Sequence, residues 1–235
     1  MQAAHPVPGA RIPGESLVPD RGPHHRPPAA DGQAPRIGVL ALQGDVLEHL
    51  RLIERAGAVG VPVRREDELA TVDGLVLPGG ESTTIGLLLD RTGLAAPVQA
   101  RLAEGLPVLG TCAGAILLAR EPRQHDGTPT GQWCLGALDV AARRNAFGRQ
   151  VASFEADLDV AGLTDPMRAV FIRAPWFEDL GAGVEVLATV ATDVGARVVV
   201  VRQGPVLASA FHPELSDDPR LHRLLVDAVV TRDPA

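Results

Sequence analysis

Short apolar runs alternate with amphipathic stretches from Arg36 onward. The run "IGVLAL" (37–42) precedes "DVLEHLRLIERA" (45–56), in which apolar residues recur at helical spacing before Gly57. A short, continuous apolar run is typical of a strand covered on both faces, whereas the second stretch is typical of a helix with one apolar face. Because glycine commonly ends a helix, this part of the chain predicts a strand followed by a helix that ends near residue 56.

The same alternation continues to residue 119. We expect strands and helices in turn, at 59–64 and 72–80 (strands), 82–90 and 94–104 (helices), 106–111 (strand) and 112–119 (helix). Strands that alternate with helices in this way indicate a parallel sheet with helices on both of its faces. The pattern therefore predicts an α/β fold of three layers, flavodoxin-like in outline.

The pattern changes after Glu121. The segment "PRQHDGTPTGQ" (122–132) is rich in turn-forming residues and predicts a surface loop. Strand-like runs separated by turn residues follow at 138–144, 150–160, 169–175, 184–190, 196–203 and 205–214. The last segment, 218–232, has apolar residues on one helical face. We therefore expect a mixed, mainly parallel sheet with several antiparallel strands, and a closing helix.

The first 34 residues differ in composition from the rest of the chain. They are rich in Pro, Gly and charge, and they lack the continuous apolar region of a secretory signal. We expect a disordered extension (1–34) ahead of one folded domain (35–235). The extension contains His5, His24 and His25, which we interpret as part of a solvated tail and not as metal ligands.

Charge and cysteine content narrow the function further. Twenty-two basic residues against 29 acidic ones give a net charge of −7, which argues against a nucleic-acid or membrane surface. The two cysteines, Cys112 and Cys134, cannot form a disulfide framework, and no Cys/His cluster has the spacing of a structural zinc site. We therefore expect a cytoplasmic protein that holds no metal and has small-molecule or protein partners.

Cys112 lies between two glycines in "GTCAG" (110–114). A nucleophile on a sharp turn from a strand into a helix needs small neighbours, because strand and helix cross closely there. Gly110 and Gly114 supply that room, and the start of the helix would favour the thiolate. The backbone N–H of Ala113 would then face a developing oxyanion. A buried cysteine beside glycines is also often a plain core residue, so this motif alone leaves both interpretations open.

A thiol nucleophile needs a base, and the base needs a carboxylate to orient it. The segment "FHPE" (211–214) offers His212 and Glu214, two positions apart. On an extended segment both side chains project to the same side, so the carboxylate could reach one imidazole nitrogen while the other nitrogen faces the thiol. An exposed loop histidine beside a charge is the alternative interpretation.

Consecutive glycines in "PGGEST" (78–83) follow a predicted strand. Glycine lets backbone N–H groups approach a ligand closely, which suits an oxyanion hole or a carboxylate cradle. The alternative is an ordinary tight turn in which Ser82 caps the next helix. The order and combination of the three motifs indicate a cysteine-dependent active site more strongly than any one motif does.

The chain resembles the glutaminase subunits of pyridoxal 5'-phosphate synthase, a subfamily of the class I glutamine amidotransferases. The similarity spans residues 36–232 and rests on "GVLALQGD", "LPGGEST", "GTCAGAILLA", "RRNAFGRQVASFEADL", "FIRAP" and "FHPEL", in that order. "GTCAG" and "HPE" are general to the class, whereas "RNAFGRQ", "SFE" and "FIRAP" are similar to this subfamily. The resemblance implies one class I glutamine amidotransferase domain.

The resemblance also implies an activity: hydrolysis of L-glutamine to L-glutamate and ammonia, with the ammonia supplied for pyridoxal 5'-phosphate (vitamin B6) biosynthesis. By the matched motifs, Cys112 is the nucleophile, His212 the base and Glu214 the residue that orients it. Two further groups follow from the same match: substrate-binding residues Gly80, Glu81, Ser82, Arg144, Ile172 and Arg173, and an oxyanion hole of Gly80 and Ala113. The implied partner is a (β/α)8-barrel synthase subunit in a large hetero-oligomer, and no cofactor is implied.

Three alternatives stay open at this point. An α/β-hydrolase relative would place the acid before the histidine, whereas here the carboxylate follows it in "HPE". A glutaminase of another synthase would share the cysteine turn and the His-Glu pair but not the subfamily motifs. A non-catalytic scaffold would be expected to lack one of the three catalytic residues. The loop 122–133 is longer than the family pattern, and we expect it to touch no catalytic residue.

Overall fold

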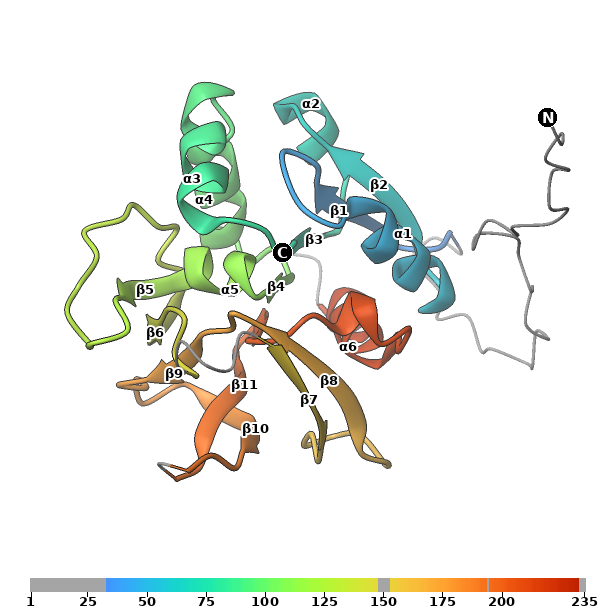
Figure 1. Ribbon diagram of the computed structural model, residues 1–235. Coiled ribbons are helices and arrows are strands. Elements are labelled where there is room, and N and C mark those ends of the chain that lie inside the picture. Colours follow the sequence, from blue (N-terminus) through green and yellow to red (C-terminus); the bar gives the residue numbers. More distant parts are fainter. Residues whose placement is uncertain (1–32, 148–152, 194, 233–235) are drawn as a thin grey trace, which may run out of the picture.

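The structure is a computed structural model that describes residues 33–147, 153–193 and 195–232. The predicted extension, 1–34, lies almost wholly outside the described residues. One half of the central sheet is built from parallel strands, in the order β2 (Val59–Val63), β1 (Arg36–Leu40), β3 (Gly74–Leu77), β4 (Val108–Thr111) and β12 (Val206–Ser209) (Figure 1). This half carries the strand ends at which the predicted motifs lie.

Beyond β12 the sheet becomes mixed. It continues through β11 (Arg197–Gln203), β9 (Trp176–Glu178), β6 (Leu138–Arg143) and β5 (Ala119–Arg123), and β10 (Glu185–Val190) lies beside β11. Here β11 runs antiparallel to β12, β10 and β9, and β9 runs antiparallel to β6. A separate antiparallel pair is formed by β7 (Ser153–Leu158) and β8 (Met167–Ile172). The predicted antiparallel additions in the second half are confirmed.

Helices cover both faces of the parallel half, as expected for an α/β fold (Figure 1). One face is covered by α1 (Val46–Arg55) and α6 (Arg220–Val230), and the other by α3 (Ser82–Arg91), α4 (Ala95–Ala103) and α5 (Ala113–Leu118). A short α2 (Glu66–Leu69) follows β2, and a 3-10 helix η1 (Pro213–Leu215) follows β12. The predicted fold of three layers is confirmed.

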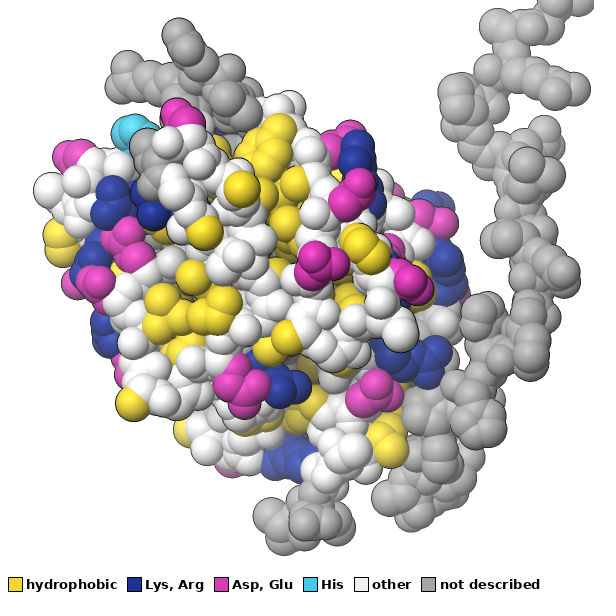
Figure 2. All heavy atoms as spheres, turned by 90° about the horizontal axis from the view of Figure 1, so that it is seen from below, with side chains coloured by type: hydrophobic (Ala, Val, Ile, Leu, Met, Phe, Trp, Pro, Cys, Tyr) yellow, Lys and Arg dark blue, Asp and Glu magenta, His cyan; other side chains and the backbone are white. Residues whose placement is uncertain are grey.

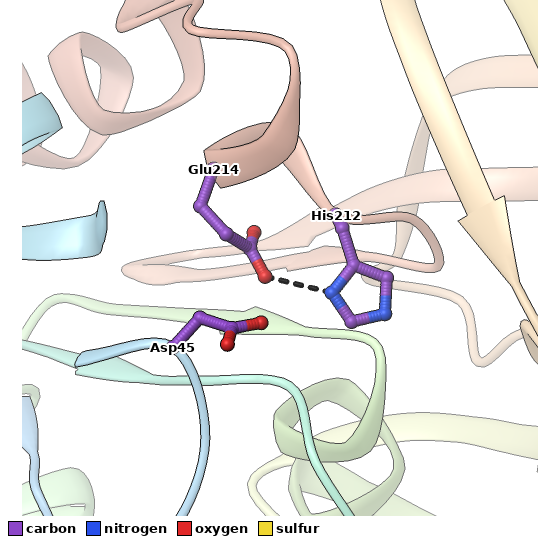
Figure 3. Close-up of side chains that lie close together, drawn as sticks. All are labelled: Asp45, His212 and Glu214. Atoms are coloured by element: carbon purple, nitrogen blue, oxygen red, sulfur yellow. Dashed lines mark hydrogen bonds and ion pairs between the residues drawn. The ribbon is translucent and has the colours of Figure 1, made fainter. Parts of the chain in front are cut away.

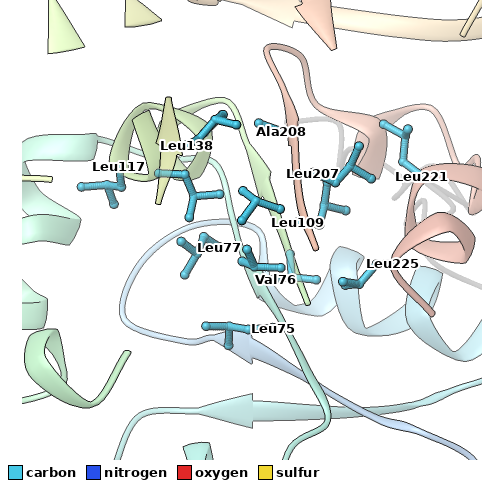
Figure 4. Packing of buried hydrophobic residues seen from close by; sticks show 14 of the residues in the cluster. Leu75, Val76, Leu77, Leu109, Leu117, Leu138, Leu207, Ala208, Leu221 and Leu225 are labelled. Atoms are coloured by element: carbon cyan, nitrogen blue, oxygen red, sulfur yellow. The ribbon is translucent and has the colours of Figure 1, made fainter. Parts of the chain in front are cut away.

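The central strands are buried on both faces, and this burial holds their ends in fixed positions. Every residue of β3, β4 and β12 is buried. Figure 4 shows side chains of these strands packed with side chains of α5, α6 and β6: Leu75, Val76, Leu77, Leu109, Leu117, Leu138, Leu207, Ala208, Leu221 and Leu225. Truncating one such leucine to alanine typically costs about 2–5 kcal/mol, so the core fixes the frame on which the site is built.

The structure departs from the sequence expectations in two segments, the helix after Cys112 and residues 212–214. The helix after Cys112 ends at Leu118, and Ala119 already starts β5, which extends into the predicted loop as far as Arg123. Pairing with β6 creates this strand, and such a contact across the chain leaves no local signal. The segment 212–214 is also not extended, because Pro213 starts the 3-10 helix η1.

One face of the molecule agrees with the expectation from net charge. On the face shown in Figure 2, acidic and basic side chains are interspersed, with small groups of apolar side chains between them. A nucleic-acid surface needs clustered basic side chains, which this mixed distribution does not supply. Across the ranges that the structure describes, no helix is long and apolar enough to cross a membrane.

Candidate active site

Cys112 lies at the sharp turn from β4 into α5. Its backbone has φ 46° and ψ −103°, a conformation that residues with a side chain rarely adopt. The turn is held from both sides: the N–H of Cys112 donates to the Ser209 carbonyl at 2.9 Å, and the N–H of Ile116 donates to the Cys112 carbonyl at 3.1 Å. This is the strained strand-to-helix turn that the motif predicts for a nucleophile.

The glycines on either side of Cys112 let strand and helix cross at close range. A Cβ on Gly114 would lie 1.9 Å from the carbonyl oxygen of Leu77, and a Cβ on Gly110 would lie 2.6 Å from Leu118 Cδ1. Neither distance leaves room for a side chain. The predicted reason for both glycines is therefore confirmed.

His212 and Glu214 form a buried hydrogen-bonded pair (Figure 3). His212 Nδ1 and Glu214 Oε1 are 2.7 Å apart. The N–H of His212 donates to the Val170 carbonyl in β8 at 2.9 Å, which fixes the base relative to that strand. The sequence argument for this pair assumed an extended segment and was wrong on that point. The turn of η1 brings the carboxylate to the imidazole instead.

The surroundings of His212 stabilise its protonated form. Burial by itself would lower the pKa of this histidine, but its interactions with Cys112 and Glu214 outweigh burial and raise the pKa to about 10. The same contacts favour a proton on both ring nitrogens of His212, with Nδ1–H donated to Glu214 Oε1. A protonated histidine in this position can supply a proton to a group in the cavity.

Cys112 and His212 open onto a cavity of about 430 Å³. With one exception, Glu214, every predicted site residue lines it: Gly80, Glu81, Ser82, Cys112, Ala113, Arg144, Ile172, Arg173 and His212. Glu214 contacts His212 from outside the cavity lining. A cavity of about 540 Å³ near the end of α6 is lined by none of them. The structure thus brings together residues from five separate motifs.

The glycine turn after β3 packs directly against the His212 ring. A Cβ on Gly79 would lie 2.5 Å from His212 Cε1, and Gly80 has φ 139°, which favours glycine. The N–H of Glu81 donates to Gln43 Oε1 at 3.2 Å. Glu81, and not Ser82, caps α3, because its carboxylate accepts from the N–H of Thr84 at 2.8 Å. The alternative of a cap by Ser82 is therefore wrong.

Ala113 opens α5 immediately after Cys112. The first N–H groups of a helix have no carbonyl partner within the helix, so the N–H of Ala113 is free of the helical ladder. This is the position from which a backbone donor can reach an oxyanion beside Cys112.

Arg144 lies in the cavity between two acceptors. Its guanidinium donates to Glu81 Oε1 at 2.9 Å and to Gln132 Oε1 at 3.0 Å. Gln132 Oε1 also accepts from Ser82 Oγ at 3.2 Å. The loop 122–133 therefore holds two predicted substrate-binding residues through Gln132, although it touches none of the three predicted catalytic residues.

Ile172 is the last residue of β8, Arg173 follows it, and both line the cavity that Cys112 lines. Cys112 Sγ lies 4.0 Å from the carbonyl oxygen of Ile172. Arg173 has φ 45°, so the chain turns sharply as it leaves the strand. These two residues therefore form the wall of the cavity beside the sulfur.

Sequence reasoning missed several residues of the cavity, among them Gln43, Asp45 and Asn145. The signal for the first two was their place in "QGD", directly after the first buried strand, where loops at one edge of a parallel sheet converge. Asp45, His212 and Glu214 offer possible metal-ligand atoms that all lie within 4.8 Å (Figure 3). Because His212 Nδ1 is already bonded to Glu214, this geometry suits orientation of the base. The absence of a metal stays a prediction.

The order of the catalytic groups along the chain identifies the class of protein. In α/β-hydrolases the acid precedes the histidine, whereas here Glu214 follows His212 by two positions. A cysteine turn with this order on a mainly parallel sheet argues against that class and favours the class I glutamine amidotransferases, as the resemblance in the motifs implies.

Comparison with known proteins gives the family. Residues 39–231 match the SNO glutamine amidotransferase family, and the chain belongs to it. A protein of Parafrankia sp. (strain EAN1pec) named "Pyridoxal 5'-phosphate synthase subunit PdxT" is 62% identical over 83% of this chain and 94% of its own length. A protein of the same name from Acidothermus cellulolyticus is 60% identical over 84% of this chain and 95% of its own length.

A solved structure titled "Crystal structure of glutamine amidotransferase" agrees with this assignment. It is 50% identical, has a TM-score of 0.74, and is matched over 82% of this chain and 98% of its own. The resemblance stated from the motifs and the predicted fold class are both confirmed.

Proposed function

We propose that this chain hydrolyses L-glutamine to L-glutamate and ammonia with a Cys112-His212-Glu214 triad, and supplies the ammonia for pyridoxal 5'-phosphate biosynthesis. The observation that carries the proposal is the position of Cys112. It stands on a strained turn, lines a cavity of about 430 Å³, and shares that cavity with a histidine whose second ring nitrogen is bonded to a buried carboxylate. The names of its relatives support the pathway.

The chemistry follows from the groups that line the cavity. Cys112 Sγ attacks the side-chain amide carbon of glutamine, and the electron pair of the carbonyl moves onto oxygen. The N–H groups of Ala113 and Gly80 stabilise this oxyanion, and loss of one such donor typically costs on the order of 100-fold or more in rate. His212 gives its Nε2 proton to the amide nitrogen of the substrate, and the C–N bond breaks as the carbonyl re-forms. Ammonia departs, and a glutamyl thioester remains on Cys112.

The second half of the reaction uses the same groups in reverse order. His212, now neutral, removes a proton from water, and the hydroxide attacks the thioester carbonyl. The C–S bond breaks, glutamate forms, and the thiolate and imidazolium are restored. Throughout the cycle, Glu214 holds Nδ1–H and keeps Nε2 directed at the reacting atoms.

Substrate recognition requires a partner for the α-carboxylate of glutamine. A guanidinium binds a carboxylate in a bidentate manner, and Arg144 is half of an ion pair with Glu81 inside the cavity. We infer that the substrate carboxylate exchanges with Glu81 for this arginine. Gly80, Ser82, Ile172 and Arg173 then border the rest of the glutamine.

A synthase subunit is the proposed receiver of the ammonia, and we assign it a (β/α)8-barrel fold in a large hetero-oligomer. The relatives are named as subunits of a synthase, which requires a further chain. Apolar side chains at the cavity support docking on this side, because Ile172 is 37% exposed and Leu215 is 45% exposed.

The test measures glutamate release from L-glutamine by the full chain, with and without its cognate synthase subunit. Cys112→Ala is the test variant, and Cys134→Ala is the matched control, because Cys134 is the other free cysteine and does not line the cavity. We expect Cys112→Ala to abolish release and Cys134→Ala to retain it. Release that survives Cys112→Ala would overturn the proposed nucleophile.

A further inference from the structure

A buried chain of polar groups continues from Glu214 into the interior of the protein. Glu214 Oε2 makes no hydrogen bond to any described residue, and His49 Nε2 of α1 faces it at 3.5 Å. His49 Nδ1 lies 2.8 Å from Nε2 of His222, which belongs to α6. Thr111 Oγ1 lies 3.3 Å from His49 Nε2. His49, Thr111 and His222 are fully buried, and no step of the proposed reaction uses them.

The chemistry of the groups fixes where the protons lie. A carboxylate only accepts, and the Thr111 hydroxyl oxygen can accept too, so both groups that face His49 Nε2 suit the Nε2–H tautomer of His49. His49 Nδ1 is then an acceptor, so the short contact requires His222 to donate from its own Nε2. His222 Nδ1 is left as a bare lone pair, and this atom is buried with no hydrogen-bond partner among the described residues. A lone pair needs no proton acceptor, so the arrangement leaves no buried N–H unsatisfied.

Both rings are neutral in this arrangement. Burial lowers the pKa of His49 and of His222 to about 3, although Glu214 acts in the opposite direction on His49. The ionisable groups that face His49 are Glu214 from η1, His222 from α6 and His212. Because His49 stays neutral, the negative charge of Glu214 remains available to the His212 imidazolium.

We propose that His49, oriented by His222, is a positioning residue of the glutaminase site: it anchors Glu214 Oε2 and so holds Oε1 toward His212. The inference rests on the proposed function of the triad. A carboxylate held through one oxygen can rotate about its Cγ–Cδ bond, whereas a second contact at the other oxygen, here the approach of His49 Nε2 to 3.5 Å, opposes that rotation. His49 therefore fixes the carboxylate, which fixes the imidazole, which directs Nε2 at the sulfur.

The first test reads the proton positions in the wild-type full chain. Nitrogen-15 NMR of the histidine rings distinguishes the two neutral tautomers from the imidazolium. At pH 7 we expect His49 and His222 as neutral Nε2–H tautomers and His212 with both nitrogens protonated. A charged His49, or a His49 with its proton on Nδ1, would overturn the inference, and this reading does not depend on turnover or on a variant that folds.

The second test separates positioning from packing. His49→Phe keeps the ring volume without nitrogen, and His49→Gln places an amide donor near the position of Nε2. Leu52→Ala is the matched control, since Leu52 is a buried residue of the same helix that takes no part in the polar chain. The measurements are kcat and KM for glutamine with the synthase subunit present, below the melting temperature of each variant.

We expect His49→Phe to lower kcat by about 10-fold or more with KM within about 2-fold, the size typical when a group that orients a functional histidine is lost. His49→Gln should restore most of the rate, and Leu52→Ala should lower the melting temperature without changing kcat. If His49→Phe turns over at the wild-type rate while Cys112→Ala is inactive, the role of His49 is overturned and the proposed function stands. Turnover in Cys112→Ala would overturn the proposed function.

Discussion

Two buried histidines should make the folded chain sensitive to mild acid. Burial lowers the pKa of His49 and of His222 from 6.5 to about 3, so at pH 5 both are neutral when folded. In the unfolded chain both would bind a proton below pH 6.5. The unfolded state therefore binds more protons, and stability is present above pH 6.5 and is lost as the pH falls from 6.5 toward 3.

The size of the loss follows from the two pKa values. For each histidine, the free energy of unfolding falls by about 1.4 kcal/mol per pH unit below 6.5. At pH 5 this amounts to about 2 kcal/mol for one histidine and about 4 kcal/mol for the pair. His212 has the opposite sign: its pKa is raised to about 10, so its contribution is complete below pH 6.5 and is lost as the pH rises through 10. Carboxylates with a lowered pKa, such as Glu178 and Asp218, titrate from 4.5 and 3.8 downward. The range from pH 6.5 to 5 therefore isolates the two buried histidines.

The assay is urea unfolding followed by circular dichroism at pH 6.5, 6, 5.5 and 5. His222→Gln removes one of the two titrating rings and should halve the loss across this range. His125→Gln is the matched control, since His125 is exposed, and it should lose as much as the wild type. A wild type that loses less than about 1 kcal/mol, or a His222→Gln variant that loses as much as the wild type, would refute the reasoning.

Three further predictions concern the cavity. The free energy of unfolding, measured with urea, should be about 1 kcal/mol higher for Cys112→Gly than for Cys112→Ala, because glycine relieves the backbone strain at φ 46°. Equal stability of the two variants would argue against such strain. Gly79→Ala should lower kcat by at least about 10-fold in steady-state assays, because its Cβ would lie 2.5 Å from His212 Cε1, whereas an unchanged kcat would mean that the base tolerates displacement. Gln132→Ala should raise KM for glutamine by about 10-fold with kcat within about 3-fold, because it removes the acceptor shared by Arg144 and Ser82, and an unchanged KM would contradict that role.

The parts of the fold that the sequence predicted well are those with a strong local signal. The buried strands β3 and β4 read as continuous apolar runs because both of their faces are covered. Gly110 and Gly114 marked the nucleophile turn because no side chain fits there. A local pattern therefore located the chemistry without any knowledge of the tertiary structure.

The parts that escaped prediction depend on contacts between distant segments. β5 forms from a charged stretch because β6 lies beside it, and the sequence from residue 119 onward gives no local signal for this pairing. The His49-His222 contact joins positions 173 residues apart, and neither histidine stands in a recognised motif. Gln132 reaches Arg144 and Ser82 from a loop whose composition indicates only an exposed turn.

Covalent labelling of the cysteine is the most direct measurement of the proposed chemistry. The full chain, with its synthase subunit present, would be treated with a glutamine analogue that carries an electrophilic diazoketone in place of the amide, and the adduct would be located by peptide mass spectrometry. We predict one equivalent of label on Cys112, blocked by excess L-glutamine and absent when His212 is replaced by Ala. Label on Cys134, or an active enzyme that takes no label on Cys112, would contradict the assignment of Cys112 as the nucleophile.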